Sequence, residues 1–347
     1  MSAISYSSHG STEVLEFGTL PQPSIKANQI LVHTEYAALN PCDFKFRRME
    51  IPSFIADFLF PKPKIPALDL AGVVAEVGAD VTTFKVGDRV AATQPIVHTR
   101  WGTLSEYSAV DASHAALVPE SVSLRDAAAV SLVGLTAVQA LANVATSPGD
   151  TILIHAGSGG LGSFAVQWAS KVLGLHVSAT ASAKNKDFLE SLGADVAIDY
   201  RAEGSDAWDA GEPEYDVILD PMSYAYESRV LGTGVLSPTG HYLNIASSNW
   251  APGKGGIEEA NGLRTYLNLA YYGIKNAAAS VGLGEKGMGY SFVAIVPDGE
   301  MLAGILAQLE KGAVRAVIDK QFDLAEAKQA YEHLETGRAK GKVVIKI

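Results

Sequence analysis

The chain has 347 residues, of which 48% are hydrophobic and 19% are charged. This length and composition are typical of a globular protein with two domains, and they exclude a disordered or fibrous chain. The formal net charge of −11 disfavours binding to nucleic acid or to an anionic membrane surface. No apolar run reaches the roughly 20 residues of a membrane span, and residues 1–10 resemble neither a secretory signal nor a transit peptide, so we expect a cytoplasmic protein.

The first 120 residues are predicted to be rich in β-strands. Apolar and polar residues alternate over 29–38 and 71–77, as in half-buried strands, and 84–91 is predicted to be a strand entered through a Gly-Asp turn. Prolines between 52 and 66 predict an irregular connection. We therefore expect a barrel-like domain in this part of the chain.

Helices and strands alternate after residue 120. Residues 123–126 offer helix-capping side chains ahead of an Ala-, Leu- and Val-rich helix at 127–142. The following segments are predicted to be strands at 151–156, 176–180, 196–199 and 215–220, and helices at 160–173 and 184–192. Such alternation predicts a parallel, doubly wound sheet.

The end of the chain interrupts this rhythm and then resumes it. Glycine and asparagine are frequent over 249–290, which we expect to form a long excursion near the active site. Helices are predicted at 301–311 and 327–336, and 342–347 is predicted to be a closing strand.

A glycine-rich turn is the most informative motif. The apolar strand at 151–156 leads directly into Gly157-Ser158-Gly159-Gly160-Leu161-Gly162, and a helix begins within this segment. Gly157 permits a tight turn, Gly159 lets the backbone approach a diphosphate, and Gly162 allows the helix to pack closely on the strand. The free N–H groups at the helix start attract phosphate. We therefore predict a dinucleotide site that includes Ala156 and the whole turn.

The end of the next predicted strand indicates which dinucleotide binds. An NAD-binding protein usually has an acidic residue there, whereas this chain has Thr180, Ser182, Lys184 and Lys186. Hydroxyl and ammonium groups can bind a 2′-phosphate that a carboxylate would repel. These residues predict NADPH, although the alternative of a solvated helix start with incidental lysines stays open.

Six motifs in chain order resemble the medium-chain dehydrogenase/reductase superfamily, and most closely its zinc-free, quinone oxidoreductase-like branch. They are Ala38-Leu39-Asn40-Pro41-Cys42-Asp43, Val86-Gly87-Asp88-Arg89-Val90, Gly134-Leu135-Thr136-Ala137, the segment 154–162, the pair Leu192-Gly193-Ala194-Asp195 and Ile198-Asp199-Tyr200, and the terminal Gly337-Arg338-Ala339-Lys340-Gly341-Lys342. The resemblance implies an α/β fold in which a Rossmann-type doubly wound parallel sheet is inserted in a β-rich, GroES-like barrel domain. We expect the catalytic domain at 1–120 and 286–347 and the NADPH domain at 121–285.

The resemblance also implies individual roles. Asn40, Asp43 and Thr136 are the expected catalytic residues, because they match positions beside the nicotinamide. Tyr200 and Arg338 match positions that contact the 2′-phosphate, Lys342 matches a basic residue near the cofactor, and Asn244 is a further candidate cofactor contact.

Zinc is not expected. Aligned with the zinc-dependent relatives, Asn40 stands at the cysteine ligand position and Leu68 at the histidine position, and leucine cannot bind a metal. Cys42, the single cysteine, is interpreted as a small, partly buried residue, and His155 as structural.

These features predict an NADPH-dependent reductase of quinones or α,β-unsaturated carbonyls, which need no metal because the transferred charge is delocalised. Two alternatives stay open: a cofactor-binding redox sensor or partner protein with little turnover, and a trans-acting enoyl reductase. The segment 48–53 has no tyrosine that could serve as the acid found in related enoyl-thioester reductases. A homodimer is expected from the resemblance.

Overall fold

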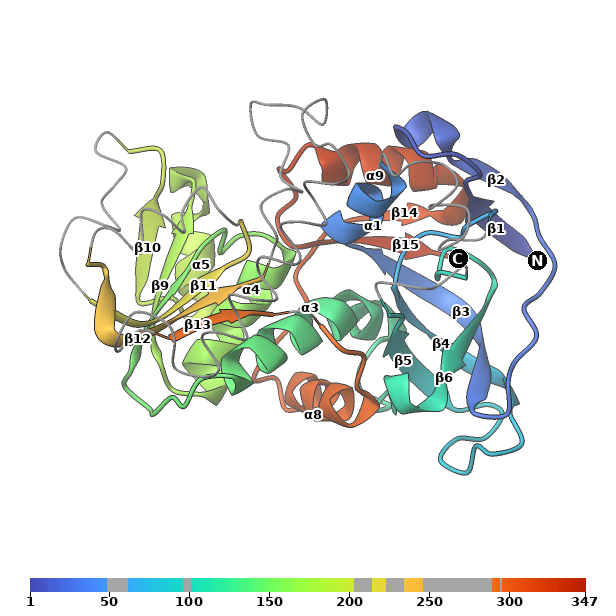
Figure 1. Cartoon of the computed structure of the whole chain (residues 1–347), viewed down its shortest axis with the longest axis horizontal. Coiled ribbons are helices and arrows are strands. Elements are labelled where there is room, and N and C mark those ends of the chain that lie inside the picture. The colour runs from blue at the N-terminus through green and yellow to red at the C-terminus, as the bar shows by residue number, and fades with distance from the viewer. Residues whose placement is uncertain (49–61, 96–100, 203–213, 223–233, 246–288, 294) are drawn as a thin grey trace. The chain divides into compact units, whose positions relative to one another are not determined.

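The computed structural model describes residues 1–48, 62–95, 101–202, 214–222, 234–245, 289–293 and 295–347 (Figure 1). The chain forms two compact units. Unit 1 contains Met1–Leu135 and Ile295–Ile347, and unit 2 contains Thr136–Ala294. Unit 2 is therefore an insertion in the chain of unit 1, as the predicted fold class requires. The expected boundaries at 120 and 285 stay a prediction about the functional domains.

Unit 1 is built on a seven-stranded sheet. Its strands lie in the order β14-β15-β3-β4-β5-β7, and β6 pairs with β3. They are β3 (Gln29–Leu39), β4 (Asp69–Val77), β5 (Arg89–Thr93), β6 (Tyr107–Asp111), β7 (Ala115–Leu117), β14 (Ile318–Asp323) and β15 (Lys342–Lys346). All neighbours are antiparallel except β14 and β15. The last strand of the chain thus pairs with β3, which brings residues from both ends of the sequence together.

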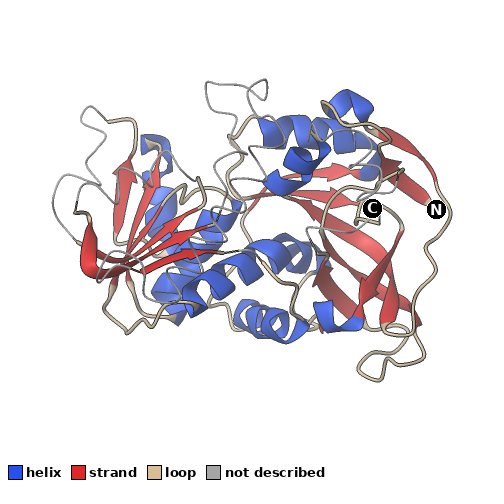
Figure 2. Cartoon of the chain, viewed as in Figure 1, coloured by secondary structure: helices blue, strands red, loops and turns tan. Residues whose placement is uncertain are grey.

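The remaining elements of unit 1 surround this sheet (Figure 2). A separate two-stranded sheet contains β1 (Ser2–Ser5) and β2 (Glu16–Thr19). The helices are α1 (Pro41–Arg47), α8 (Gly299–Glu310) and α9 (Ala327–Glu335), with 3-10 turns at Thr12–Val14, Ala112–His114 and Leu324–Glu326. Apolar side chains from β1, β3, β15 and α9 form one buried cluster, and those from β3, β4, β5 and β6 form another.

One predicted strand is shorter in the structure. The prediction of a strand from 84 onward is wrong for its first five residues, because β5 begins at Arg89. The residues before Arg89 form a tight turn, in which the Lys85 N–H donates to the Asp88 carboxylate at 2.9 Å. Gly87 has φ +93°, a conformation that a strand does not contain.

Unit 2 is built on a six-stranded parallel sheet in the order β10-β9-β8-β11-β12-β13. Its strands are β8 (Thr151–Ile154), β9 (His176–Ala181), β10 (Val196–Asp199), β11 (Tyr215–Asp220), β12 (Leu236–Asn244) and β13 (Gly289–Phe292). The chain starts at β8, adds two strands on one side and then continues on the other side at β11. This is the predicted doubly wound topology, whose ligand sites lie at the carboxyl ends of the strands near the reversal.

Helix α3 (Leu124–Ala142) begins three residues before the predicted start at 127, within the predicted capping segment, where the Ser123 hydroxyl accepts the Asp126 N–H at 3.0 Å. Within the described residues it is the one helix long and apolar enough to cross a membrane, but 78% of that stretch is buried inside the protein. It is therefore an internal helix.

The helices of unit 2 follow the glycine turn and β9. Helix α4 (Gly160–Gln167) continues as a π-helical segment at Trp168–Val172, and a 3-10 turn at Ala183–Asn185 precedes α5 (Lys186–Leu192). The predicted excursion at 249–290 lies outside the described residues except for its last two residues, which belong to β13.

Candidate functional site: a dinucleotide turn and a buried polar cluster

The glycine turn of unit 2 is held by Thr180 on the neighbouring strand. Strand β8 ends at Ile154, and Ala156 adopts φ +52°, an unusual conformation for a residue with a side chain. The Ala156 N–H donates to the Thr180 hydroxyl at 3.1 Å, and the Gly157 N–H donates to the Thr180 carbonyl at 2.8 Å. Thr180 was predicted to contact the cofactor, and its hydroxyl is engaged in stabilising the turn.

Close packing explains the last glycine of the motif. A Cβ on Gly162 would lie 2.3 Å from the Ala156 carbonyl oxygen and 2.7 Å from the Gly157 Cα. A Cβ on Gly159 would meet no atom closer than 3.4 Å, so space is free on that side of the turn. In glycine turns of this kind, the diphosphate of the ligand approaches the backbone on this open side.

Helix α4 begins at this free space without a side-chain cap. Gly159 is the N-cap residue and offers no side-chain hydrogen bond to the first turn. The first N–H groups of the helix carry the positive end of the helix dipole, which favours an anion. The turn and helix start therefore fit the diphosphate of a dinucleotide.

The candidate contacts for an adenosine lie at the ends of β9 and β10. The two strands are parallel, with Asp199 opposite Ala181, and the Tyr200 N–H donates to the Ala181 carbonyl at 3.2 Å. Tyr200 therefore lies beside Ser182, the first residue after β9. Lys184 is exposed, whereas the Lys186 ammonium is 3.9 Å from the Glu190 carboxylate.

Two residues near these strand ends were missed by sequence reasoning. The Arg201 guanidinium lies 5.1 Å from the centre of the Tyr200 ring and adds a cation there. The Asn185 side chain contacts both Ser158 and Ser182. Arg201 follows a predicted contact residue directly, and Asn185 is the N-cap residue of α5, but neither signal by itself distinguishes a site residue from a surface residue.

Asn244 and Asp220 end neighbouring strands at the carboxyl edge of the same sheet. Asn244 ends β12, is 1% exposed and donates to the Tyr290 hydroxyl at 3.1 Å. The adjacent Asp220 ends β11 and accepts hydrogen bonds from the Tyr242 hydroxyl and from the Met222 N–H. Asn244 lies at the edge where a doubly wound sheet binds its ligand.

Unit 1 contains a second polar cluster at the start of α1. Asn40 precedes the helix, and its N–H donates to the Asp43 carboxylate at 2.7 Å. The Asn40 amide donates to the Asp69 carboxylate at 2.9 Å, while its oxygen accepts a hydrogen bond from the Lys342 ammonium. The same ammonium is 3.1 Å from the Asp69 carboxylate. Residues from three distant segments thus share one buried network.

Burial changes the protonation of this network. It raises the pKa of Asp69, although the Lys342 ammonium and hydrogen bonds from Asn40 and the Leu132 N–H counteract that effect. Burial also raises the pKa of Asp43 to about 7, and the Asp69 charge acts in the same direction. The pKa of the Cys42 thiol is well above its usual range because of burial and the nearby Asp43 charge. Cys42 is therefore not an activated nucleophile, which agrees with its interpretation as a partly buried side chain.

The donor atoms of this cluster do not fit zinc. An amide, a carboxylate and an ammonium meet here, and the ammonium already neutralises the carboxylate. Leu68 is buried and offers no ligand atom. Within the ranges that the structure describes, no three His, Cys, Asp or Glu residues lie close enough to hold a metal ion.

The other predicted site residues belong to different parts of the chain. Thr136 is buried on α3 and is the first residue of unit 2. Arg338 is exposed in the turn after α9 of unit 1, and Tyr200 belongs to unit 2, so their joint contact with a 2′-phosphate stays a prediction. His155 is buried, and burial lowers its pKa to about 3, which keeps it neutral.

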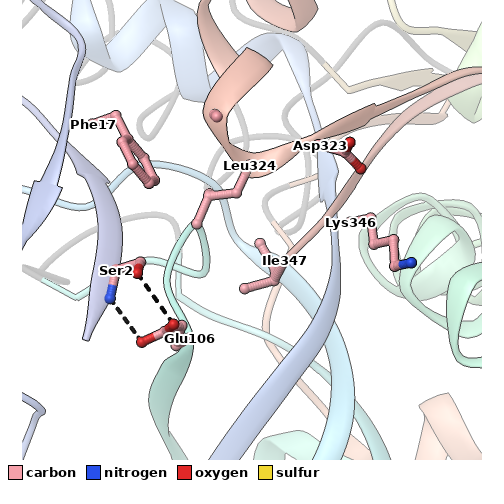
Figure 3. Close-up of a pocket in the computed structure, with 8 residues that line it drawn as sticks. Ser2, Phe17, Glu106, Asp323, Leu324, Lys346 and Ile347 are labelled. Carbon is pink, nitrogen blue, oxygen red and sulfur yellow. Dashed lines mark hydrogen bonds between the residues drawn. The ribbon is translucent and has the colours of Figure 1, made fainter.

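A pocket at the far end of β15 contains none of the predicted site residues (Figure 3). Lys346 and Ile347 line it, whereas Lys342 stands at the opposite end of the strand. Its Glu106 carboxylate accepts hydrogen bonds from the Ser2 N–H at 2.7 Å and from the Ser2 hydroxyl at 3.1 Å. Glu106 thus secures the N-terminal strand.

The two units define a dinucleotide-binding oxidoreductase fold, and comparison with known proteins identifies its family. Residues 26–120 match the alcohol dehydrogenase GroES-like domain, and residues 192–345 match the zinc-binding dehydrogenase family. The chain belongs to the medium-chain dehydrogenase/reductase family, as its motifs predicted.

Similar proteins extend this result over the whole chain. The chain is 33% identical to a 2-methylene-furan-3-one reductase of Solanum lycopersicum, over 99% of its length and 79% of that protein. It is 30% identical to a chloroplastic NADPH-dependent alkenal/one oxidoreductase of Arabidopsis thaliana, over 99% of this chain and 79% of that protein. The solved quinone oxidoreductase of Coxiella burnetii is 28% identical, with a TM-score of 0.82 over 100% of this chain and 99% of that one.

Proposed function

We propose that the chain is an NADPH-dependent, zinc-independent reductase that transfers a hydride to a quinone or an α,β-unsaturated carbonyl compound. The observation that supports this most is the residue set beside the glycine turn: Ser182 and Lys184 follow β9, where NAD-binding proteins have an acidic residue, and Tyr200 lies next to Ser182 at the end of β10. The names of the similar reductases support both the cofactor and the substrate class.

Two parts of the proposed cofactor site would bind different phosphate groups. The turn from Ala156 to Gly162 would bind the diphosphate, and Ser182, Lys184 and Tyr200 would bind the 2′-phosphate. When bound, the nicotinamide supplies the hydride. Quinones and enones suit a site without zinc, because their conjugation spreads the negative charge that a metal would otherwise stabilise.

The Asn40 cluster is proposed to form the catalytic part of unit 1. The Asp43 carboxyl group can retain a proton near neutral pH, because burial raises its pKa to about 7. Lys342 holds the amide of Asn40 in one orientation through its contacts with Asn40 and Asp69. Lys342 thereby orders the proposed catalytic residues of unit 1, in addition to its predicted contact with the cofactor.

Fluorescence titration with NADPH and NADH tests the cofactor. We expect NADPH to bind at least about tenfold more tightly, which corresponds to about 1.4 kcal/mol. Lys184→Ala should reduce this preference, whereas Lys171→Ala, which removes an exposed lysine of the π-helical segment, should leave it unchanged. Equal affinities for the two cofactors would contradict the proposal.

Turnover with a simple quinone and a simple enone tests the reaction. Oxidation of NADPH that depends on either substrate is the expected result. Tight binding without turnover would instead favour the redox sensor, and turnover only with carrier-bound substrates would favour the trans-acting enoyl reductase.

We also propose a cytoplasmic homodimer. The apolar helix α3 is mostly buried, which does not favour a membrane location. Strand β13 is at the edge of the parallel sheet among the described strands, where a second copy could pair. Analytical ultracentrifugation would test the dimer, and cell fractionation would test the location, for which a chloroplast is the alternative because one similar plant protein is chloroplastic.

A further inference from the structure

Asn185 joins the two loops that would bind opposite ends of the adenosine diphosphate. Its side-chain nitrogen lies 3.1 Å from the Ser158 hydroxyl and 3.4 Å from the Ser182 hydroxyl. Ser158 belongs to the glycine turn after β8, and Ser182 follows β9. Asn185 therefore connects the proposed diphosphate site to the proposed 2′-phosphate pocket.

The direction of these hydrogen bonds determines what the two serines offer to a ligand. An amide nitrogen only donates, so both hydroxyl oxygens accept from Asn185. Each hydroxyl then keeps its own hydrogen for another acceptor. No described residue accepts a hydrogen bond from either of these hydroxyls. Both O–H groups are thus free to donate to an anionic oxygen.

The charges around Ser182 favour an anion. Lys184 is exposed two residues along the chain, and Arg201 lies against Tyr200, which is itself beside Ser182. Asp199, which ends β10, accepts the backbone N–H of Arg201 at 3.0 Å, and Asp187 is exposed in the first turn of α5. A phosphate at Ser182 would therefore meet one oriented hydroxyl and two cations.

We infer that Asn185 is a positioning residue that determines the preference for NADPH, by fixing the Ser158 and Ser182 hydroxyls as phosphate donors. The inference rests on the proposed function. Without Asn185, each hydroxyl could rotate and the two loops would lose their direct link. The resulting loss should be greater for a ligand that carries the 2′-phosphate than for one that lacks it.

The test compares the dissociation constants of NADPH and NADH for the full-length protein and its variants. Asn185→Ala should weaken NADPH binding about tenfold and NADH binding only about twofold, because both cofactors would lose the Ser158 contact with the diphosphate, whereas only NADPH has a 2′-phosphate that would also lose the oriented Ser182 hydroxyl. Asn143→Ala is the matched control, since the Asn143 amide also donates a hydrogen bond, at 2.9 Å to the Gln139 carbonyl. The control should leave both constants unchanged.

A double-mutant cycle separates positioning from a direct or merely structural role. If Asn185 acts through Ser182, Ser182→Ala combined with Asn185→Ala should lower the NADPH preference little more than Ser182→Ala alone. Additive effects of the two substitutions would overturn the inference.

A second variant, Asn185→Asp, tests the inference in case the Asn185→Ala protein does not fold. Asn185→Asp preserves the shape of the side chain but turns the donor into an acceptor that repels phosphate, so it should lower the NADPH preference further. An unchanged preference in a folded variant would overturn the inference while leaving the proposed cofactor intact. A wild-type protein that prefers NADH would overturn both.

Discussion

Lys342 is the cation on which the buried polar cluster of unit 1 depends. The side chains of Lys342 and Asp69 are 5% and 0% exposed, so water does not screen their charges. Among the described residues Lys342 is the cation paired with Asp69, and a buried carboxylate that loses such a partner is left with an uncompensated charge. The network therefore contributes stability chiefly by keeping Asp69 paired.

We predict that Lys342→Met destabilises the protein by about 3–5 kcal/mol, because it leaves the Asp69 charge buried and unpaired. Urea unfolding followed by circular dichroism would measure the change. Lys346→Met, at the exposed end of the same strand, should change the unfolding free energy by no more than about 0.5 kcal/mol. Equal effects of the two substitutions would contradict this role of Lys342.

Asp43 should make stability depend on pH. Its pKa in the folded protein is about 7, above the ordinary value of 3.8, because of burial and the Asp69 charge. Between these two values the folded state holds a proton that the unfolded state has released. The contribution of Asp43 to the free energy of unfolding is therefore fully present below about pH 4 and is lost as the pH rises through about 7.

We predict that Asp43→Asn reduces the loss of stability between about pH 4 and about pH 7, because an amide has no charge to bury. Thermal unfolding of both proteins across this range would measure the effect. Asp187→Asn, which alters an exposed carboxylate on α5, is the control and should preserve the wild-type slope. Identical slopes for wild type and Asp43→Asn would rule out Asp43 as the titrating group.

At the scale of elements, the junction of β8 and α4 depends on two glycines for different reasons. The Cβ position of Gly162 is blocked by backbone atoms of Ala156 and Gly157, which cannot rotate away as a side chain could. The Cβ position of Gly159 faces free space beside the turn. A methyl group at Gly162 should therefore disturb the packing of α4 on β8, whereas a methyl group at Gly159 should affect ligand binding.

We predict that Gly162→Ala destabilises the fold by about 1–3 kcal/mol, because α4 must move away from β8 to relieve the overlap. Gly159→Ala should keep the fold but weaken NADPH binding at least about tenfold, because its methyl group would enter the space left for the diphosphate. Thermal unfolding and fluorescence titration of both variants would separate the effects. A stable Gly162→Ala protein that binds NADPH normally would contradict the packing argument.

Most elements could be predicted from the sequence because their patterns are local. The strand β10 and the N-terminal cap of α3 occur where apolar spacing and capping residues place them. The start of β5 could not be predicted, because its alternating pattern continues through a turn that Gly87 and Asp88 form. Helix α4 also gives no sequence signal of its change to π-helical geometry at Trp168.

At the scale of the whole molecule, we predict that the protein holds no catalytic metal and is active without one. We expect the purified protein to contain far less than one zinc ion per chain, since Asn40, Leu68 and Lys342 leave no suitable set of ligands. Metal analysis by mass spectrometry and turnover after treatment with a chelator would test this. Stoichiometric zinc, with activity lost on its removal, would contradict it.

The sequence by itself determined the family, the doubly wound sheet and the dinucleotide turn. These depend on residues that are close along the chain, such as the glycines from Gly157 to Gly162, so their spacing alone carries the information. The expected absence of zinc also follows from residue types, because Leu68 has no ligand atom whatever its surroundings are.

Only the tertiary structure decided which polar groups are partners. Asp69 and Lys342 are 273 residues apart and meet because β15 pairs with β3, which pairs in turn with β4. The contact of Asn185 with Ser158 likewise requires β8 and β9 to lie side by side. Burial and pairing arise from this folding of distant segments, so the raised pKa of Asp43 and the contacts of Asn185 with Ser158 and Ser182 have no signature in the linear sequence.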